Sequence, residues 1–151
     1  MTGPSFRFRL ERVRAVRERK EDVAKQELAQ AVVRLSNSRA KLLSAQADEE
    51  SARAAQRLPA GEGTLTASEL IARQAFLERV EAERIARMRD LSRSEAEVAQ
   101  RDAALTVASS EHEMLKRLRE RHRGEHDREL ARREGIQLDE MATTRYHGSA
   151  A

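Results

Sequence analysis

The stretch Pro59-Ala60-Gly61-Glu62-Gly63 separates two long runs that contain no helix breaker. Neither residues 5–58 nor residues 64–123 include a proline or a glycine, and both runs are rich in Ala, Arg, Glu, Leu and Gln. These residue types favour long helices, whereas the Pro/Gly stretch predicts a reversal. We therefore expect an all-α fold, a long antiparallel two-helix coiled-coil hairpin.

The boundaries follow from local signals. Thr66-Ala67-Ser68-Glu69 has the spacing of a capping box, and Gly135 is a plausible helix end. We expect one elongated hairpin over residues 1–151. It would have a helix at ~6–57, a turn at ~58–66, a second helix at ~67–134 and a flexible tail at ~135–151.

A seam of apolar, small and some polar residues recurs at heptad spacing. In the first helix it contains Leu28, Ala31, Leu35, Ser38, Leu42, Ala45, Glu49 and Ala52. In the second it contains Leu77, Val80, Arg84, Met88, Leu91, Glu95, Val98, Asp102, Leu105, Ala108, Leu115 and Leu118. Before Leu28 the apolar residues leave this spacing, which predicts a stutter or a frayed segment with Phe6, Leu10, Val13, Val16 and Val23.

The register decides which residues are left without a partner. If Arg57 lies opposite Ala67, then Phe6 lies opposite Leu118, and residues 119–134 overhang the first helix. A single helix this polar is marginal in water. We expect the overhang either to fray or to be held by another protein.

Composition argues against an enzyme. Charged residues reach 36%, aromatic residues only 3%, and the chain has no cysteine. A two-helix hairpin has no enclosed pocket for catalytic side chains, and Gly61-Glu62-Gly63 is too short for a phosphate-binding loop. We expect no catalytic residues, no cofactor and no small-molecule substrate.

The sequence predicts a cytoplasmic protein. The longest uncharged run, residues 103–110, is far shorter than the ~20 residues that span a bilayer. The first residues lack the apolar core of a signal peptide.

Basic residues concentrate in two segments that meet at the open end of the predicted hairpin. Residues 1–20 carry seven basic and two acidic side chains, and residues 116–134 carry eight and five. Antiparallel pairing brings these segments together, and such a surface favours an acidic partner. Nucleic acid is not expected, because Arg alternates with Glu and stacking aromatics are scarce.

His122 and His126 lie four residues apart and share a helix face, with Glu129 nearby. Arg123 occupies the position of the glutamate in a metalloprotease motif. Because further arginines surround the pair and repel cations, we expect a solvated basic face and no metal site.

Several apolar residues cannot all face one partner helix: Val32, Val33, Ile71, Phe76 and Ile85. They indicate either local packing over the turn or a docking patch near the tip of the hairpin.

The sequence resembles the FliJ family of the bacterial flagellar type III export apparatus. The resemblance rests on Phe6-Arg7-Phe8-Arg9-Leu10-Glu11, on Val13, Arg17-Glu18 and Glu21, and on the late Leu138-Asp139-Glu140 with Ala142 and Arg145. It implies a non-catalytic coiled coil similar to the rotary stalk of F-type ATPases. It also implies three partners: the hexameric export ATPase, the cytoplasmic domain of the export-gate membrane protein, and export chaperones. The expected location is then cytoplasmic, with peripheral association at the inner membrane.

The resemblance and the charge pattern together give two candidate sites. We expect the terminal end to contact the ATPase ring through Arg9, Arg12, Arg14, Arg17, Arg117, Arg119, Arg121 and Arg123. We expect the export-gate contact at Leu42, Ile71 and Phe76. Two alternatives remain open: the equivalent stalk of a virulence secretion system, and a generic homodimeric coiled-coil scaffold.

Overall fold

A computed structural model of the chain describes residues 5–57 and 66–148. It contains two helices, α1 (Glu11–Arg57) and α2 (Ala67–Gly148). The predicted all-α, antiparallel two-helix coiled-coil hairpin is confirmed. The predicted turn lies outside the described residues except for Thr66, which precedes α2.

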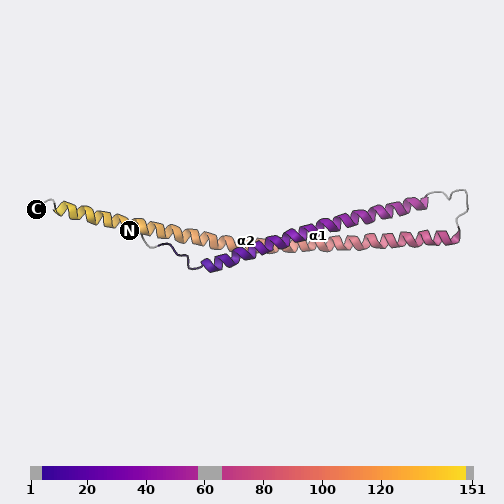
Figure 1. Cartoon of the computed structure of the whole chain (residues 1–151), viewed down its shortest axis with the longest axis horizontal. Helices are drawn as coiled ribbons and strands as arrows, with labels where there is room; N and C mark the ends of the chain where they lie inside the picture. Colours follow the sequence, from indigo (N-terminus) through magenta and orange to yellow (C-terminus); the bar gives the residue numbers. More distant parts are fainter. Residues whose placement is uncertain (1–4, 58–65, 149–151) are drawn as a thin grey trace. The chain divides into compact units, whose positions relative to one another are not determined.

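The chain divides into two units. Unit 1 contains residues 1–22 and 107–151, and unit 2 contains residues 23–106. Within unit 2, α1 and α2 lie side by side and run in opposite directions (Figure 1). Unit 1 contains the start of α1, the residues before it, and the second half of α2.

The first helix starts later than expected, at Glu11 rather than near residue 6. Residues 5–8 have no regular secondary structure, and a turn at Arg9 and Leu10 leads into α1, with Glu11 N donating to Phe8 O at 3.2 Å. Phe8 is buried while Arg7 and Arg9 are exposed. Alternating Phe and Arg have a period of two, which puts both rings on one side of an extended chain but not of a helix.

The predicted capping box at the start of α2 is confirmed. Thr66 N donates to Glu69 Oε2 at 2.8 Å, and Glu69 N donates to Thr66 Oγ1 at 3.2 Å. The hydrogen bond from the Thr66 backbone is the main cause that lowers the pKa of the Glu69 carboxyl. The reciprocal bonds satisfy amides that a helix start would otherwise leave without acceptors.

The second helix continues well past its predicted end near Gly135, to Gly148. A glycine inside a helix costs about 1 kcal/mol relative to alanine, which a favourable neighbourhood can offset. Just before Gly135, Arg132 and Arg133 both donate to the Glu129 carboxylate, at 2.9 and 3.0 Å. Such local pairs support the helix across the glycine.

In unit 2 the predicted seam of α1 is confirmed, whereas that of α2 is partly wrong. Ala31, Ala45, Glu49 and Ala52 are buried, and the other predicted α1 seam residues are half-buried. In α2, Met88, Glu95 and Asp102 were expected in the seam but are exposed. The adjacent Arg87, Ser94 and Arg101 are half-buried instead and keep the strict three–four spacing.

Small residues explain why arginine can occupy this seam. Every seventh residue of α1 in unit 2 is small: Ala24, Ala31, Ser38, Ala45 and Ala52. The pairing of the helices places Arg87 level with Ala45 and Arg101 level with Ala31. A long aliphatic stem fits beside a small residue and carries its charged group to the edge of the seam. The guanidinium of Arg101, for example, donates to Glu27 at 2.8 Å.

The register differs from the expected one by eight to nine residues, slightly more than one heptad. Glu49 Oε2 lies 2.5 Å from Arg84 Nε, and the hydroxyls of Ser38 and Ser94 are 2.9 Å apart. In unit 1, likewise, Phe6 contacts His126 rather than lying opposite Leu118. The expected register would have placed the buried Glu49 opposite Ala75, which offers no counter-charge.

The seam of α1 continues into unit 1 without the predicted stutter, but its residues become polar. Arg14, Arg17 and Glu21 occupy the heptad positions and are half-buried. Val13 and Val16, which sequence reasoning placed near the seam, are exposed. Heptad spacing, rather than side-chain hydrophobicity, fixes which side of α1 faces α2 here.

Candidate interaction surfaces

All eight arginines predicted to contact an ATPase ring lie in unit 1. Six of them are ion-paired with carboxylates of the same chain: Arg14, Arg17, Arg117, Arg119, Arg121 and Arg123. The basic surface is therefore less positive than a count of arginines suggests.

Three of these arginines hold unit 1 together. Arg14 donates to Glu11 at 2.7 Å and to Glu18 at 3.3 Å, and Arg119 lies 3.3 Å from Glu11. The hydrogen bond from Arg14 is the main cause that lowers the pKa of the Glu11 carboxyl. Arg17 pairs with Glu111 across the seam. These side chains bridge α1 and α2 or order the start of α1.

Three others form exposed pairs within α2. Arg117 lies 3.1 Å from Glu113, Arg121 lies 3.1 Å from Glu125, and Arg123 lies 4.0 Å from Asp127. Their side chains are 78%, 76% and 68% exposed, respectively. Solvent-exposed pairs of this kind contribute little and exchange readily for another partner.

Arg9 and Arg12 differ from the other six. Both are exposed, and neither has an ion pair within the described part of the chain. They border a hollow of about 480 Å³ that is also lined by Phe6, Phe8 and Arg119. Among the eight arginines, they carry the least compensated charge.

His122 and His126 pack on phenylalanine rings. The His122 ring lies edge-on to Phe8 with centroids 5.9 Å apart, and the His126 ring is tilted against Phe6 at 5.7 Å. Sequence reasoning missed this contact because it placed both histidines on an unpartnered overhang. The two pairs occur at matching intervals of two and four residues, as expected for an extended strand beside a helix.

Sequence reasoning also missed a polar contact around Glu21. His112 Nδ1 donates to Glu21 Oε2 at 2.6 Å, and Ser109 Oγ donates to Glu21 Oε1 at 3.2 Å. The side chains of His112 and Glu21 are only 16% and 15% exposed. Among the described residues, no group of three or more His, Cys, Asp or Glu is arranged to hold a metal ion.

The three residues predicted for the gate contact do not form one patch. Leu42 is half-buried in the seam of unit 2, whereas Ile71 and Phe76 are 70% and 47% exposed. Ile71 and Phe76 are five residues apart on α2, which separates them by ~140° around the helix. Each therefore belongs to a different flank of the hairpin.

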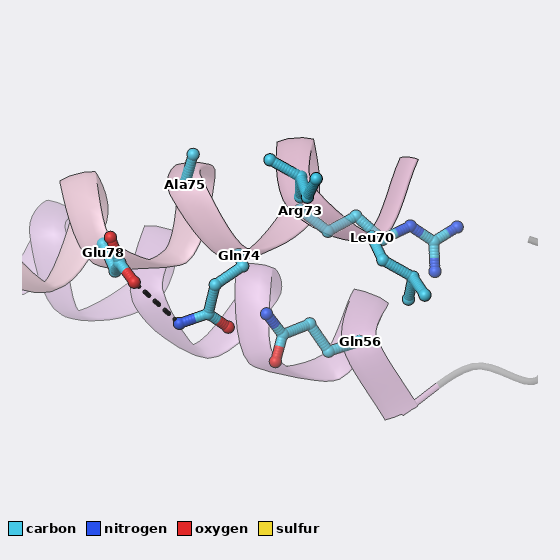
Figure 2. Close-up of a pocket in the computed structure, with 7 residues that line it drawn as sticks. Gln56, Leu70, Arg73, Gln74, Ala75 and Glu78 are labelled. Carbon is cyan, nitrogen blue, oxygen red and sulfur yellow. Dashed lines mark hydrogen bonds between the residues drawn. The ribbon is translucent and has the colours of Figure 1, made fainter. Parts of the chain in front are cut away.

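Ile71 lines a hollow of about 600 Å³ together with Gln56 at the end of α1 and Leu70, Arg73 and Glu78 of α2. In this hollow Gln74 Nε2 donates to Glu78 Oε1 at 2.9 Å, and Gln56 of α1 lies nearby (Figure 2). The lining also includes the apolar side chains of Leu70, Ile71 and Ala75, so the hollow combines apolar and polar groups.

Phe76 lines a hollow of about 490 Å³, with Ala52, Ala55 and Val80 among the lining residues. The Arg79 guanidinium lies over the Phe76 ring, 5.2 Å from its centroid. Asp48 also lines this hollow. The small alanines of α1 leave the half-exposed ring accessible from one side.

A family model, described as flagellar FliJ protein, matches residues 6–151. The chain belongs to the FliJ family. No curated protein and no solved structure gave a significant match. The match extends from Phe6, before the turn into α1, through all of α2, so both units belong to the family region.

Family membership makes the chain a component of the flagellar export apparatus. In the described ranges, neither helix offers an apolar stretch sufficient for a membrane span.

Proposed function

We propose that this FliJ-family chain is a non-catalytic coupling protein of the flagellar export apparatus. Its unit 1 binds the hexameric export ATPase, and its unit 2 binds the cytoplasmic domain of the export gate or export chaperones. The protein then works in the cytoplasm and reaches the inner membrane only through these partners.

The observation that supports ATPase binding is the gathering of all eight candidate arginines in unit 1, two of them without a counter-charge in the described chain. Arg9 and Arg12 need no internal pair to be broken before they bind an acidic surface. Arg117, Arg121 and Arg123 follow, because their own pairs are exposed and weak. Arg14, Arg17 and Arg119 act mainly inside the unit.

Charge reversal at the unpaired arginines tests this proposal. Arg9→Glu with Arg12→Glu should raise the concentration that gives half-maximal ATPase stimulation about tenfold or more. The matched control, Arg89→Glu with Arg93→Glu, changes the same charge on unit 2 and should leave stimulation unchanged. If both variants stimulated the ATPase equally, at unchanged helical content, the proposal that this surface binds the ATPase would be wrong.

For the gate contact we propose the Phe76 hollow rather than a patch that also includes Ile71. A half-exposed aromatic ring beside small residues is a typical anchor for a partner side chain. Leu42 contributes to the seam behind it and affects binding only through folding.

Single alanine substitutions separate these roles. Phe76→Ala should weaken binding to the purified gate domain about tenfold, and Ile71→Ala should have a much smaller effect. Neither should change ATPase stimulation. Loss of ATPase stimulation with intact gate binding in Phe76→Ala would reverse the assignment of the two units.

A further inference from the structure

Unit 1 exposes large apolar residues on one flank. Between residues 11 and 21 of α1 and residues 107 and 125 of α2, the exposed large apolar side chains are Val13, Val16, Val107 and Met114. We call these four residues the valine flank. Its members are 44%, 51%, 61% and 70% exposed, respectively.

The four residues share the flank because of their places relative to the seam. Val13 immediately precedes the seam residue Arg14, and Val16 follows it by two. Val107 and Met114 follow the seam residues Leu105 and His112 by two. Equivalent positions of antiparallel helices lie on the same side of the pair.

The spacing of the valine flank repeats the heptad. Val107 and Met114 are seven residues apart, and the half-buried Leu118 continues the same alternation after Met114. An apolar stripe with this rhythm follows a third, supercoiled helix over several turns, because it does not drift around the helix surface. A flat bilayer surface requires no such rhythm.

The charge beside the valine flank is positive. Arg12, Arg19 and Lys20 are exposed on α1 next to Val13 and Val16, and none has an ion pair within the described residues. The acidic residue on this side, Glu111, is already paired with Arg17. A partner helix therefore meets uncompensated positive charge along its edge.

The opposite flank of unit 1 differs in both features. It carries the exposed Glu18, Glu113 and Glu120 beside Lys116, and no exposed large apolar side chain among the described residues of the same two stretches. The difference between the flanks gives the partner a defined side to bind.

We propose that the valine flank is a docking surface for an acidic amphipathic helix of a protein partner, which packs there as the third helix of a coiled coil. Apolar residues of that helix cover Val13, Val16, Val107 and Met114, and its carboxylates meet Arg12, Arg19 and Lys20. The inference shares Arg12 with the proposed ATPase contact, but it is carried by the four apolar residues, which that contact does not use.

The probe is a fluorescent synthetic helix of four heptads, with leucines in its seam and glutamates beside them. It is titrated into the full chain, followed by anisotropy, against the same helix with lysines in place of the glutamates. The glutamate helix should bind more tightly, and added salt should weaken it. Val16→Asp with Met114→Asp should raise its Kd about tenfold or more, since both lie at the centre of the flank.

The matched control adds the same charge elsewhere on unit 1, by Ser110→Asp with Ala131→Asp, and should bind as tightly as the unchanged chain. Both positions are exposed, so helical content should be retained in every variant. Equal binding of the two probe helices, or no effect of the Val16 and Met114 changes, would overturn the proposal. So would binding to phosphatidylglycerol vesicles, or self-association, in place of the helix.

Discussion

The seams of the two units share one spacing and differ in chemistry. In unit 2, Leu28, Leu35 and Leu42 of α1 alternate with small residues and bury apolar area, while polar seam residues such as Glu49 and Arg84 pair with one another. In unit 1 the same α1 positions hold Arg14, Arg17 and Glu21, and ion pairs and hydrogen bonds join them to α2, whose seam there keeps the half-buried Leu115 and Leu118. A heptad can thus fix geometry along a whole helix while its stabilising interactions change from burial to directional bonds.

This difference assigns different tasks to the units. Burial of apolar area makes unit 2 the stable part, because the hydrophobic contribution grows with area and needs no exact geometry. Half-exposed ion pairs contribute little net free energy and can be exchanged for pairs with another protein. Unit 1 is therefore suited to binding that rearranges its own contacts.

The largest effect should come from shortening the apolar seam. Leu35→Ala with Leu42→Ala should lower the free energy of unfolding by about 2–4 kcal/mol, because both leucines are only partly buried and lose less than core leucines. The comparable pair in unit 1, Arg17→Ala with Glu21→Ala, should cost about 1 kcal/mol. Urea unfolding followed by circular dichroism measures both, and equal costs would erase the contrast between the units.

A smaller effect should come from filling the space that the small residues leave. Ala31 has 0% exposure, so Ala31→Leu should destabilise by about 1–3 kcal/mol through overpacking. Ala40→Leu, on the exposed side of the same helix, should stay within about 0.5 kcal/mol. If Ala31→Leu were as well tolerated as Ala40→Leu, the result would contradict close packing of α1 against α2 at Ala31.

The buried pair Glu49–Arg84 should affect register more than stability. Glu49→Leu with Arg84→Leu should change the free energy of unfolding by less than about 1 kcal/mol, because an apolar pair replaces an ion pair of similar volume. The charged pair fits one register, whereas leucines also accept a slip of one heptad.

Cysteine pairs report that slip, since the chain has no cysteine of its own. Ser38→Cys with Ser94→Cys joins the observed register, and Ser38→Cys with Arg87→Cys joins a register slipped by one heptad. In the otherwise unchanged chain, only the cysteines at 38 and 94 should form a disulfide. In the Glu49→Leu, Arg84→Leu background, both cysteine pairs should form one. Cross-linking confined to the first pair in both backgrounds would show that Glu49 does not select the register.

The sequence was sufficient for features that depend on local signals. Thr66 and Glu69 form their capping box because both partners lie within one turn, and α1 ends at Arg57 ahead of the Pro/Gly stretch. Fold class followed from the same long runs without breakers. These features need no knowledge of what lies across the seam.

Features set by pairing between helices could not be predicted in the same way. Met88 is more hydrophobic than Arg87, yet Arg87 faces α1 because the small Ala45 provides room for its stem. The contact between Phe6 and His126 depends on a register that no local signal fixes. The alternating Phe6-Arg7-Phe8-Arg9 pattern, with its period of two, is the local signal that these residues lie outside the helix.

The candidate sites show the same limit. Sequence gathered the arginines correctly into one unit, but it could not tell which of them are paired, because pairs such as Arg17–Glu111 join residues far apart in the chain. It also grouped Ile71 with Phe76, although five residues of helix place them on different flanks.

The smallest expected effect is the loss of helical order around Glu129 at low pH. Hydrogen bonds from Arg132 and then Arg133 lower the pKa of Glu129 from 4.5 to about 2. A carboxyl whose pKa is lower in the folded than in the unfolded chain stabilises the fold at any pH above its unfolded-state pKa. That contribution disappears as the pH falls through the folded-state pKa. The helix around Glu129 should therefore lose a small part of its order between pH 4.5 and about 2, measured by NMR. In Glu129→Gln this pH dependence should be absent, and an unchanged transition would assign it to other groups.

The most direct test of the contrast between the units is hydrogen exchange of the isolated chain, followed by mass spectrometry of its peptides. The apolar seam predicts the slowest exchange in residues 24–52 and 77–105, faster exchange in residues 11–21 and 107–126, and the fastest in residues 127–145, where α2 has no partner segment among the described residues. Exchange in residues 107–126 as slow as in residues 77–105 would contradict the division into a stable unit 2 and a readily rearranged unit 1.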